Sequence, residues 1–218
     1  MDNDNIILQR VKNGTHYRTL EMRAVDGMPE GSCIVEGYAT TFNEPYDLYR
    51  SETLVIREQV APSAFEQADL SDVIFQYDHQ GRVFARTRNN TLTLRTDDHG
   101  LLITADLGGT EEGRKLYDEI RGGYIDRMSF AFTVSEDSEV RTVDHENSIV
   151  DYLRTITKIN RVYDVSAVSI PANDGTSISA RNYSSGILEK EKAEAERARM
   201  LKLLKLKLKL GGITDENT

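Results

Sequence analysis

Short segments that alternate polar and apolar residues recur between positions 15 and 170 of this chain of 218 residues, and turn-forming residues separate them. Residues 15–24 and 32–42 both alternate in this way, and the turn-like sequence 26–31 lies between them. Residues 52–60 form a third alternating run. Because successive side chains of a strand point to opposite faces, this period-two pattern predicts antiparallel β-structure.

Two segments predict short helices beside the strands. Thr110 can cap a helix over residues 111–121, and the glycine pair 122–123 should end it. Residues 62–68 resemble a short helix with proline in its first turn, where proline is tolerated. The expected fold class is therefore β-rich α+β. The other predicted elements are strands at 73–77, 101–107, 127–134, 149–159 and 162–170, a hairpin over 83–95 that turns at 89–90, a turn at 97–100, a polar surface loop at 135–147 and a turn at 171–175.

Composition limits the functions that the chain can have. Its formal net charge is -9, and residues 189–218 carry eight Lys and Arg against six Asp and Glu, which leaves -11 on residues 1–188. An acidic body is a poor surface for nucleic acid, so no nucleic-acid partner is expected. The single cysteine, Cys33, excludes an internal disulfide and a cysteine-cluster metal site. With no run of about 18 apolar residues and no secretory signal at the polar start, the sequence predicts a cytoplasmic protein without a membrane span.

The chain divides into three parts by composition. Residues 1–14 are expected to be a flexible lead-in, residues 15–184 the folded domain, and residues 185–218 a tail. Residues 189–210 contain no Gly or Pro and favour a helix, and residues 201–210 are basic and amphipathic. Such a segment predicts a partner surface, which could be another protein, an anionic membrane or a second copy of the chain.

Ser129 is a candidate nucleophile. It lies in the predicted strand 127–134, where Met128, Phe130 and Phe132 surround its hydroxyl with apolar side chains. Most strand serines are structural, and that is the plain alternative. A serine hydroxyl becomes a useful nucleophile only with a base in hydrogen-bonding reach.

His79 is the candidate base. It follows the predicted strand 73–77 and precedes a loop, and an imidazole with an ordinary pKa near ~6.5 suits base catalysis close to neutral pH. His16, His99 and His145 are the other histidines, and composition favours His79 over them only moderately. The plain alternative for His79 is a solvated histidine at the end of a strand.

Asp164 is the candidate acid that would orient the histidine. It lies in an otherwise apolar run, and a carboxylate inside β-structure is costly unless it is paired. The plain alternative is a salt bridge to Arg161 or Arg154. Asp78 is a rival orienter of His79, although adjacent residues on a strand point to opposite faces.

The order of these segments resembles the tailed-phage prohead (capsid maturation) serine protease family. The resemblance covers roughly residues 35–175, and the ordered set is far more specific than any one motif. The segments that carry it are Glu36-Gly37-Tyr38-Ala39 with Phe42, Val60-Ala61-Pro62-Ser63-Ala64-Phe65, Asp78-His79, Asp98-His99-Gly100-Leu101, Gly122-Gly123-Tyr124, Met128-Ser129-Phe130-Ala131-Phe132 and Asp164-Val165-Ser166-Ala167-Val168-Ser169-Ile170-Pro171-Ala172-Asn173.

The resemblance implies a fold and a set of roles. The fold would be a closed or nearly closed antiparallel β-barrel surrounded by a few helices, as in the herpesvirus capsid proteases, followed here by the C-terminal helical tail. Ser129 would be the nucleophile, His79 the general base and then acid, and Asp164 the third member. Asp164 stands where the family commonly has Glu before Val-Ser, which shortens the carboxylate arm. Herpesvirus relatives use a second histidine there, so His145 or His99 is a reserve candidate.

The resemblance also implies a biological setting. It suggests a serine endopeptidase packaged inside the immature procapsid in the host cell cytoplasm. The expected substrates are major capsid protein and scaffold segments and the protease itself, and no metal or organic cofactor is required. For the oxyanion, backbone N–H groups near the nucleophile, or Arg154 or Arg161, are candidates. The tail is expected to tether the protease to shell or scaffold, to be a target of self-cleavage, and, with the barrel helices, to offer a route to a homo-oligomer.

Two other functions remain open from the sequence. The chain could be an inactive scaffold or assembly protein that kept the protease fold and acts through its C-terminal helix. It could also be a metal-dependent hydrolase that uses His79, Asp78 and Asp164. Replacing Ser129 by alanine separates the first alternative from a protease, and chelators together with serine-directed labelling separate the second.

Overall fold

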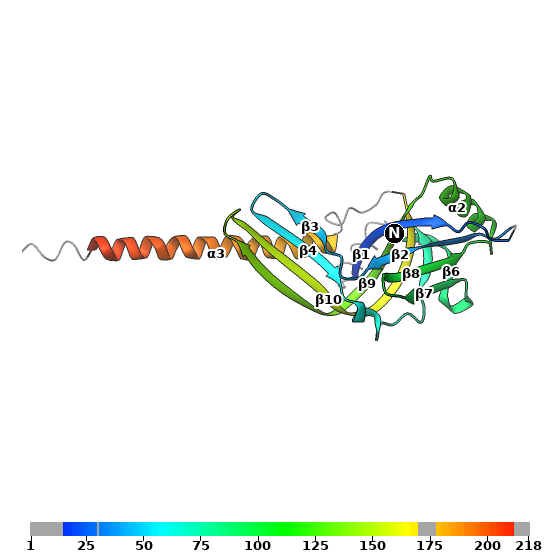
Figure 1. The fold of residues 1–218 in the computed structure, drawn as a ribbon, viewed down its shortest axis with the longest axis horizontal. Helices are drawn as coiled ribbons and strands as arrows, with labels where there is room; N and C mark the ends of the chain where they lie inside the picture. Colours follow the sequence, from blue (N-terminus) through cyan, green and yellow to red (C-terminus); the bar gives the residue numbers. More distant parts are fainter. Residues whose placement is uncertain (1–14, 30, 170–177, 212–218) are drawn as a thin grey trace, which may run out of the picture. The chain divides into compact units, whose positions relative to one another are not determined.

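The structure is a computed structural model that describes residues 15–29, 31–169 and 178–211. The expected lead-in at 1–14 and the expected turn at 171–175 lie outside the described residues. The chain divides into two compact units, residues 1–181 and residues 182–218, and each is described by itself. The first unit holds the β-structure, and the second holds most of a single long helix (Figure 1).

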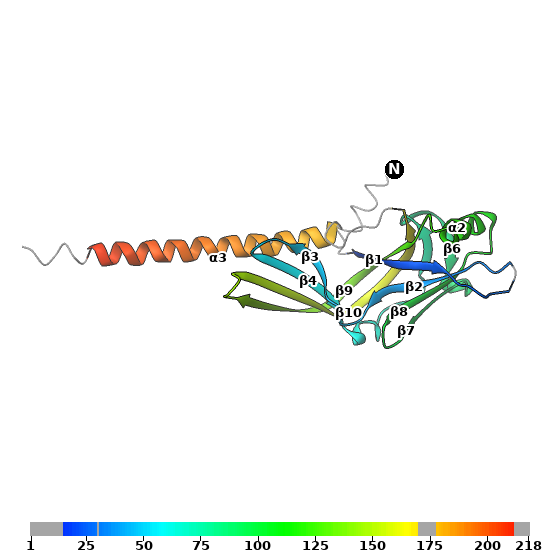
Figure 2. The same ribbon diagram turned by 45° about the horizontal axis from the view of Figure 1, so that its top comes forward.

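One mixed sheet of ten strands forms the first unit (Figures 1 and 2). Its main path runs β3-β4-β10-β9-β1-β2-β8-β7, and β5 pairs with β10 and with β6. The strands are β1 (Thr15–Ala24), β2 (Ile34–Thr41), β3 (Tyr46–Arg50), β4 (Leu54–Val60), β5 (Ile74–Tyr77), β6 (Gln80–Arg86), β7 (Leu92–Thr96), β8 (Gly100–Asp106), β9 (Arg127–Asp144) and β10 (Ile149–Val168).

The pairing of β10 corrects the expected closed antiparallel barrel. One part of β10 pairs with β4 and a later part with β5, and both pairings are parallel. The reason is the route of the chain, which leaves β4, passes through a short 3-10 helix (η1, Pro62–Phe65) and returns to the same edge of β10 as β5. Among the described residues the pairings do not join β3 to β7, so the sheet is mixed and open. The β-rich α+β class holds.

Strands β9 and β10 form a longer hairpin than the sequence predicts. The expected loop at 135–147 is strand as far as Asp144, and the two strands expected at 149–159 and 162–170 are one continuous strand as far as Val168. The residues of β9 beyond Ser135 are exposed, so their polarity reflects solvent contact and not a loop. Backbone hydrogen bonding to β10 holds them in a strand whatever the side chains are.

The region between residues 74 and 106 also differs from the prediction. The expected hairpin over 83–95 is wrong, because β6 pairs with β5 and β7 pairs with β8. A 3-10 turn (η2, Thr87–Asn89) separates β6 from β7, and Asn90 follows it in the left-handed region with φ 59. Strand β3 was not predicted at all.

The hydrophobic core lies on one face of the sheet. Strand β9 contributes Met128, Phe130 and Phe132 to it, and β10 contributes Val165 and Ala167. The rings of Phe130 and Phe132 stack with centroids 4.5 Å apart, and both side chains are fully buried. The alternate residues of β9 and β10 must therefore point to the other face.

The two α-helices agree largely with the prediction. Helix α2 (Glu111–Arg121) begins where the Thr110 hydroxyl accepts a hydrogen bond from the Gly113 N–H at 3.0 Å, and Gly122 caps its end. Helix α3 (Ile178–Gly211) begins earlier than the expected 189 and ends one residue after the expected 210. In its described second half Leu201, Leu204 and Leu208 are exposed.

A buried ionic cluster was missed by the sequence analysis. The fully buried carboxylate of Glu58 accepts hydrogen bonds from Arg18 at 2.7 Å, Arg154 at 2.9 Å and the Tyr46 hydroxyl at 2.5 Å. Burial alone would raise the pKa of Glu58, but the charges of Arg18 and Arg154 and the hydrogen bonds outweigh it and lower that pKa. The cluster ties β1, β3, β4 and β10 together.

Candidate active site

Ser129 lies on the face of β9 opposite the core. It is 2% exposed, and its cross-strand partner on β10 is the fully buried Ser166. Directly opposed residues of neighbouring strands place their side chains on the same face. Asp164, two residues before Ser166, therefore also points to the face of Ser129.

A β-bulge at Tyr163 sets this arrangement. Val162 pairs with Phe132 and the next paired residue is Asp164, opposite Ala131, so Tyr163 is the inserted residue. Without the bulge the register would place Asp164 opposite Phe130, on the core face. One extra residue exchanges the two faces of a strand. The bulge thus brings the carboxylate to the side of the sheet that carries the hydroxyl.

His79 lies at the tip of the β5–β6 hairpin. Tyr77 and Gln80 are paired, so Asp78 and His79 form a two-residue turn, with φ of 48 and 56. Two successive residues with positive φ are the geometry of a type I′ turn, for which Asn-Gly is the preferred sequence. Two residues with side chains are uncommon there, and such backbone strain is concentrated at functional sites.

The three side chains form one hydrogen-bonded chain. The Ser129 hydroxyl oxygen lies 2.8 Å from His79 Nε2, and His79 Nδ1 lies 2.5 Å from Asp164 Oδ1. Ser166 also donates to Asp164 Oδ1, at 3.0 Å. With the proton on Nδ1, the imidazole donates to the carboxylate and accepts from the serine. Asp164 is 1% exposed and the His79 side chain is 11% exposed, so little water competes for these bonds.

Asp78 holds the turn from its other side. Its Oδ1 accepts a hydrogen bond from the backbone N–H of Ser169 at 2.9 Å, and its Oδ2 accepts one from the Ser169 hydroxyl at 2.9 Å. The Asp78 N–H donates to the carbonyl of Ala167 at 2.8 Å. The carboxylate that was a rival orienter of His79 is thus directed to the end of β10, while Asp164 lies at Nδ1.

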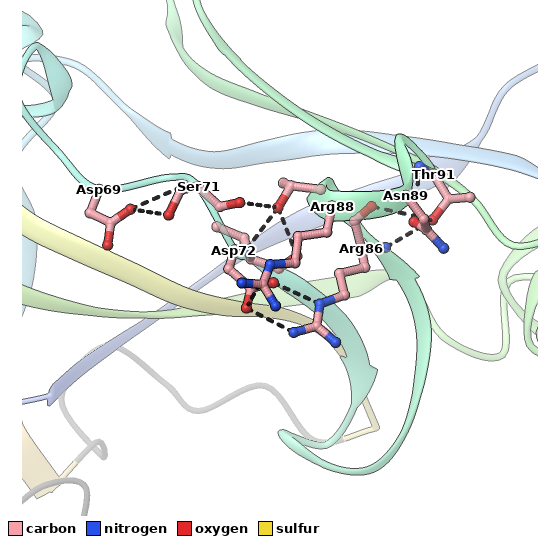
Figure 3. Close-up of polar contacts among 9 residues, drawn as sticks. Asp69, Ser71, Asp72, Arg86, Arg88, Asn89 and Thr91 are labelled. Carbon is pink, nitrogen blue, oxygen red and sulfur yellow. Dashed lines mark hydrogen bonds and ion pairs between the residues drawn. The ribbon is translucent and has the colours of Figure 1, made fainter.

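The open end of the β5–β6 hairpin is fixed by an ion pair (Figure 3). Arg86 donates to both carboxylate oxygens of Asp72, at 2.6 and 2.7 Å, and Arg88 approaches the same carboxylate at 3.6 Å. The hydrogen bonds from Arg86 are the largest effect and lower the pKa of Asp72; burial opposes them, and the charges of Arg86 and Arg88 lower that pKa further. The hairpin that carries His79 is therefore anchored at its base and at its tip.

The other candidate residues lie elsewhere. Arg154 pairs with Glu58 and Asp137, and ten residues of strand, about 30 Å, separate it from Asp164. Arg161 approaches Asp69 at 3.5 Å. His145 lies in the exposed turn beyond β9, and His99 packs against the Tyr38 ring with centroids 4.5 Å apart. Neither of these two histidines occupies the position that Asp164 takes beside His79.

Sequence reasoning missed two residues that border the site. Ser166 could have been found, because it lies two residues after Asp164 and so shares its face. Gln76 on β5 lies beside Ser166 in the register, is 6% exposed and donates to the Gly81 carbonyl at 3.3 Å. Its Oε1 has no hydrogen-bond partner among the described residues. No sequence signal pointed to it.

The part of the chain that the structure describes contains no group of three His, Cys, Asp or Glu residues that could hold a metal ion. Within those same residues, no helix has both the length and the apolar character that crossing a membrane requires.

A hydroxyl, an imidazole and a carboxylate joined in this order have the geometry of a serine hydrolase. The chain belongs to the caudovirus prohead serine protease family, which matches residues 18–190, and the resemblance seen in the sequence is confirmed. The family identifies it as a serine protease of phage capsid maturation. The solved structure of the bacteriophage T4 capsid assembly protease, gp21, matches with 13% identity and a TM-score of 0.40, over 72% of this chain and 98% of that chain. A comparison with curated proteins gives no match.

Proposed function

We propose that the chain is a serine endopeptidase in which Ser129 is the nucleophile, His79 the general base and acid, and Asp164 the orienting carboxylate. The hydrogen-bonded chain Ser129–His79–Asp164, with links of 2.8 and 2.5 Å, is the observation that carries the proposal. The family, which is defined as a serine protease family, supports the same reaction class.

The steps follow from the positions of the protons. His79 Nε2 takes the Ser129 proton as the oxygen attacks a peptide carbonyl, and it returns that proton to the departing amine. An acyl-enzyme remains on Ser129. His79 then takes a proton from water, the hydroxide attacks the ester, and the proton returns to Ser129 as the acid product leaves. Asp164 keeps Nδ1 protonated throughout and balances the charge of the imidazolium.

The proposed substrates are segments of the major capsid protein and the scaffold, and the protease itself, inside the immature procapsid in the host cell. The membership of a prohead protease family supports these substrates and this place. The proposed steps use protein side chains and water, so the proposal includes no organic cofactor or metal ion.

One pair of variants tests the reaction. The chain and its Ser129→Ala variant are expressed with the cognate capsid protein, and the fragments are weighed by mass spectrometry. Cleavage should stop in Ser129→Ala and continue in Ser138→Ala, a control on an exposed part of the same strand. Equal fragments from Ser129→Ala and the wild type would refute the proposal. If neither the wild type nor the variants give fragments, and a serine-directed reagent does not label them, the inactive assembly protein is favoured instead.

We further propose that the tail, residues 185–218, tethers the protease to shell or scaffold and is a target of self-cleavage. Support comes from Leu201, Leu204 and Leu208, which are 58%, 57% and 70% exposed beside lysines on a helix. Replacing the three leucines by glutamine should leave peptide cleavage intact and prevent incorporation into proheads. Replacing Ala193, Ala195 and Ala198 by glutamine is the matched control. Normal incorporation of the leucine variant would refute the tether.

A further inference from the structure

A hollow of about 520 Å³ lies beside Ser129 on the same face of the sheet. The proposed reaction steps assign it no role. Arg127 precedes Ser129 by two residues on β9, and its partner on β1 is Glu21. Both residues line the hollow. The hollow therefore begins at the first cross-strand pair after Ser129 that shares its face.

The position of the hollow suits a polypeptide substrate. Asp164 lies opposite Ala131, on one side of Ser129 along β9, and Arg127 lies on the other side. The hollow thus extends away from the acid end of the triad, toward β1, β2 and β8. At the spacings of a β-sheet, Tyr38 on β2 is about 12 Å from Ser129 along the face, which an extended peptide spans in about four residues.

The charged residues at the hollow are already paired. Arg127 approaches Glu21 at 3.2 Å and Asp126 at 3.6 Å, and Arg23 donates to Glu36 at 2.8 Å. A side chain with its own charge would have to break one of these pairs or remain without a counter-ion. The paired charges therefore favour an uncharged occupant over a charged one.

The lining of the hollow also includes aromatic and aliphatic residues. The ring of Tyr38 meets the ring of His99 edge to face at 4.5 Å, and Leu102 is the cross-strand partner of Tyr38. The Tyr38 hydroxyl is directed to Asp97, to which it donates at 2.8 Å, so its polar group is already satisfied. What these residues leave to a ligand is apolar surface, which favours an aromatic or large aliphatic side chain.

We propose that this hollow is a substrate subsite that binds an uncharged aromatic or large aliphatic side chain two to four residues from the scissile bond. The inference rests on the proposed protease function and adds the chemical class of its substrate. Leu102 and His99 are the residues whose replacement should change the preference.

A randomised peptide library digested by the full-length protein tests the subsite. The wild type should favour Phe, Tyr, Leu or Met over Asp and Lys by at least tenfold at one position within four residues of the cleaved bond. Leu102→Lys should lower that preference by at least tenfold and admit Asp or Glu at the same position. Val140→Lys, which adds the same charge at an exposed apolar site on β9, should leave the profile unchanged.

A second measurement separates failure of the subsite from failure of the protease. A small fluorophosphonate labels a competent serine without filling a peptide subsite, so its rate with Leu102→Lys should stay within threefold of wild type. If that variant is not labelled, Leu102→Ala and His99→Ala take its place, and each should reduce the preference by at least threefold. The subsite is overturned if the wild-type cleavage profile shows no preference for aromatic or large aliphatic side chains. It is also overturned if variants that are labelled at Ser129 keep the wild-type profile. A wild type that is neither labelled at Ser129 nor active on any peptide overturns the proposed function itself.

Discussion

The contact between Asp78 and Ser169 predicts that Asp78 acts on catalysis through the position of His79. In Asp78→Ala the two hydrogen bonds to Ser169 are lost, while the left-handed backbone at φ 48 remains. At this partly exposed site each bond contributes about 0.5 kcal/mol, and alanine in the left-handed region costs about 1 kcal/mol more than aspartate. The turn that presents His79 to Ser129 should weaken by about 2 kcal/mol.

This loss should appear in turnover and not in substrate binding. Since 1.36 kcal/mol corresponds to a tenfold change in rate, kcat should fall by about 30-fold, with KM changed by less than about twofold. The rate of fluorophosphonate labelling of Ser129 should fall in parallel. Asp78→Asn keeps one acceptor and tolerates positive φ, so it should recover much of the activity. Ser169→Ala, which removes only the hydroxyl partner, should lie between wild type and Asp78→Ala.

Asn90→Ala is the matched control, because Asn90 also has a left-handed backbone, with φ 59, in a turn that carries no proposed catalytic residue. It should lower the melting temperature through the same backbone cost and leave kcat unchanged. If Asp78→Ala lowers stability as Asn90→Ala does and keeps kcat within twofold of wild type, the positioning argument is refuted.

Three further variants test the fold. Glu58→Gln should cost about 3–5 kcal/mol in urea unfolding at pH 7, because Arg18 and Arg154 lose their buried counter-charge. The pKa of Glu58 is lowered in the folded protein, so its contribution to the free energy of unfolding is complete above about pH 4.3 and is lost as the pH falls through the folded pKa. The difference in unfolding free energy between Glu58→Gln and wild type should therefore narrow in that acid range. Thr110→Ala should cost about 1 kcal/mol in thermal unfolding through loss of the helix cap. Phe130→Ala, which removes a fully buried ring, should cost about 3–5 kcal/mol in urea unfolding.

Local patterns predicted the elements that depend on local physics. The alternation at 15–24 predicted β1 at its observed bounds, and the threonine cap with the glycine stop predicted α2. The same rules failed at 135–147, because a strand with solvent on both sides carries no alternation for a pattern to detect. The pairing of β5 and β4 with one edge of β10 is a non-local property, so no local pattern indicates a mixed sheet.

The candidate site shows the same division between local and non-local information. Residue type together with the resemblance to the prohead protease family made Ser129, His79 and Asp164 candidates, while their meeting depends on a register that no local pattern contains. The bulge at Tyr163 decides whether Asp164 shares the face of Ser129, since strict alternation would put Asp164 on the core face with Phe130. The bulge also accounts for a feature that was visible in the sequence. The carboxylate stands in an apolar run because Val162 and Val165, on either side of the inserted residue, both pack into the core, and the extra residue turns Asp164 to the opposite face without interrupting that core.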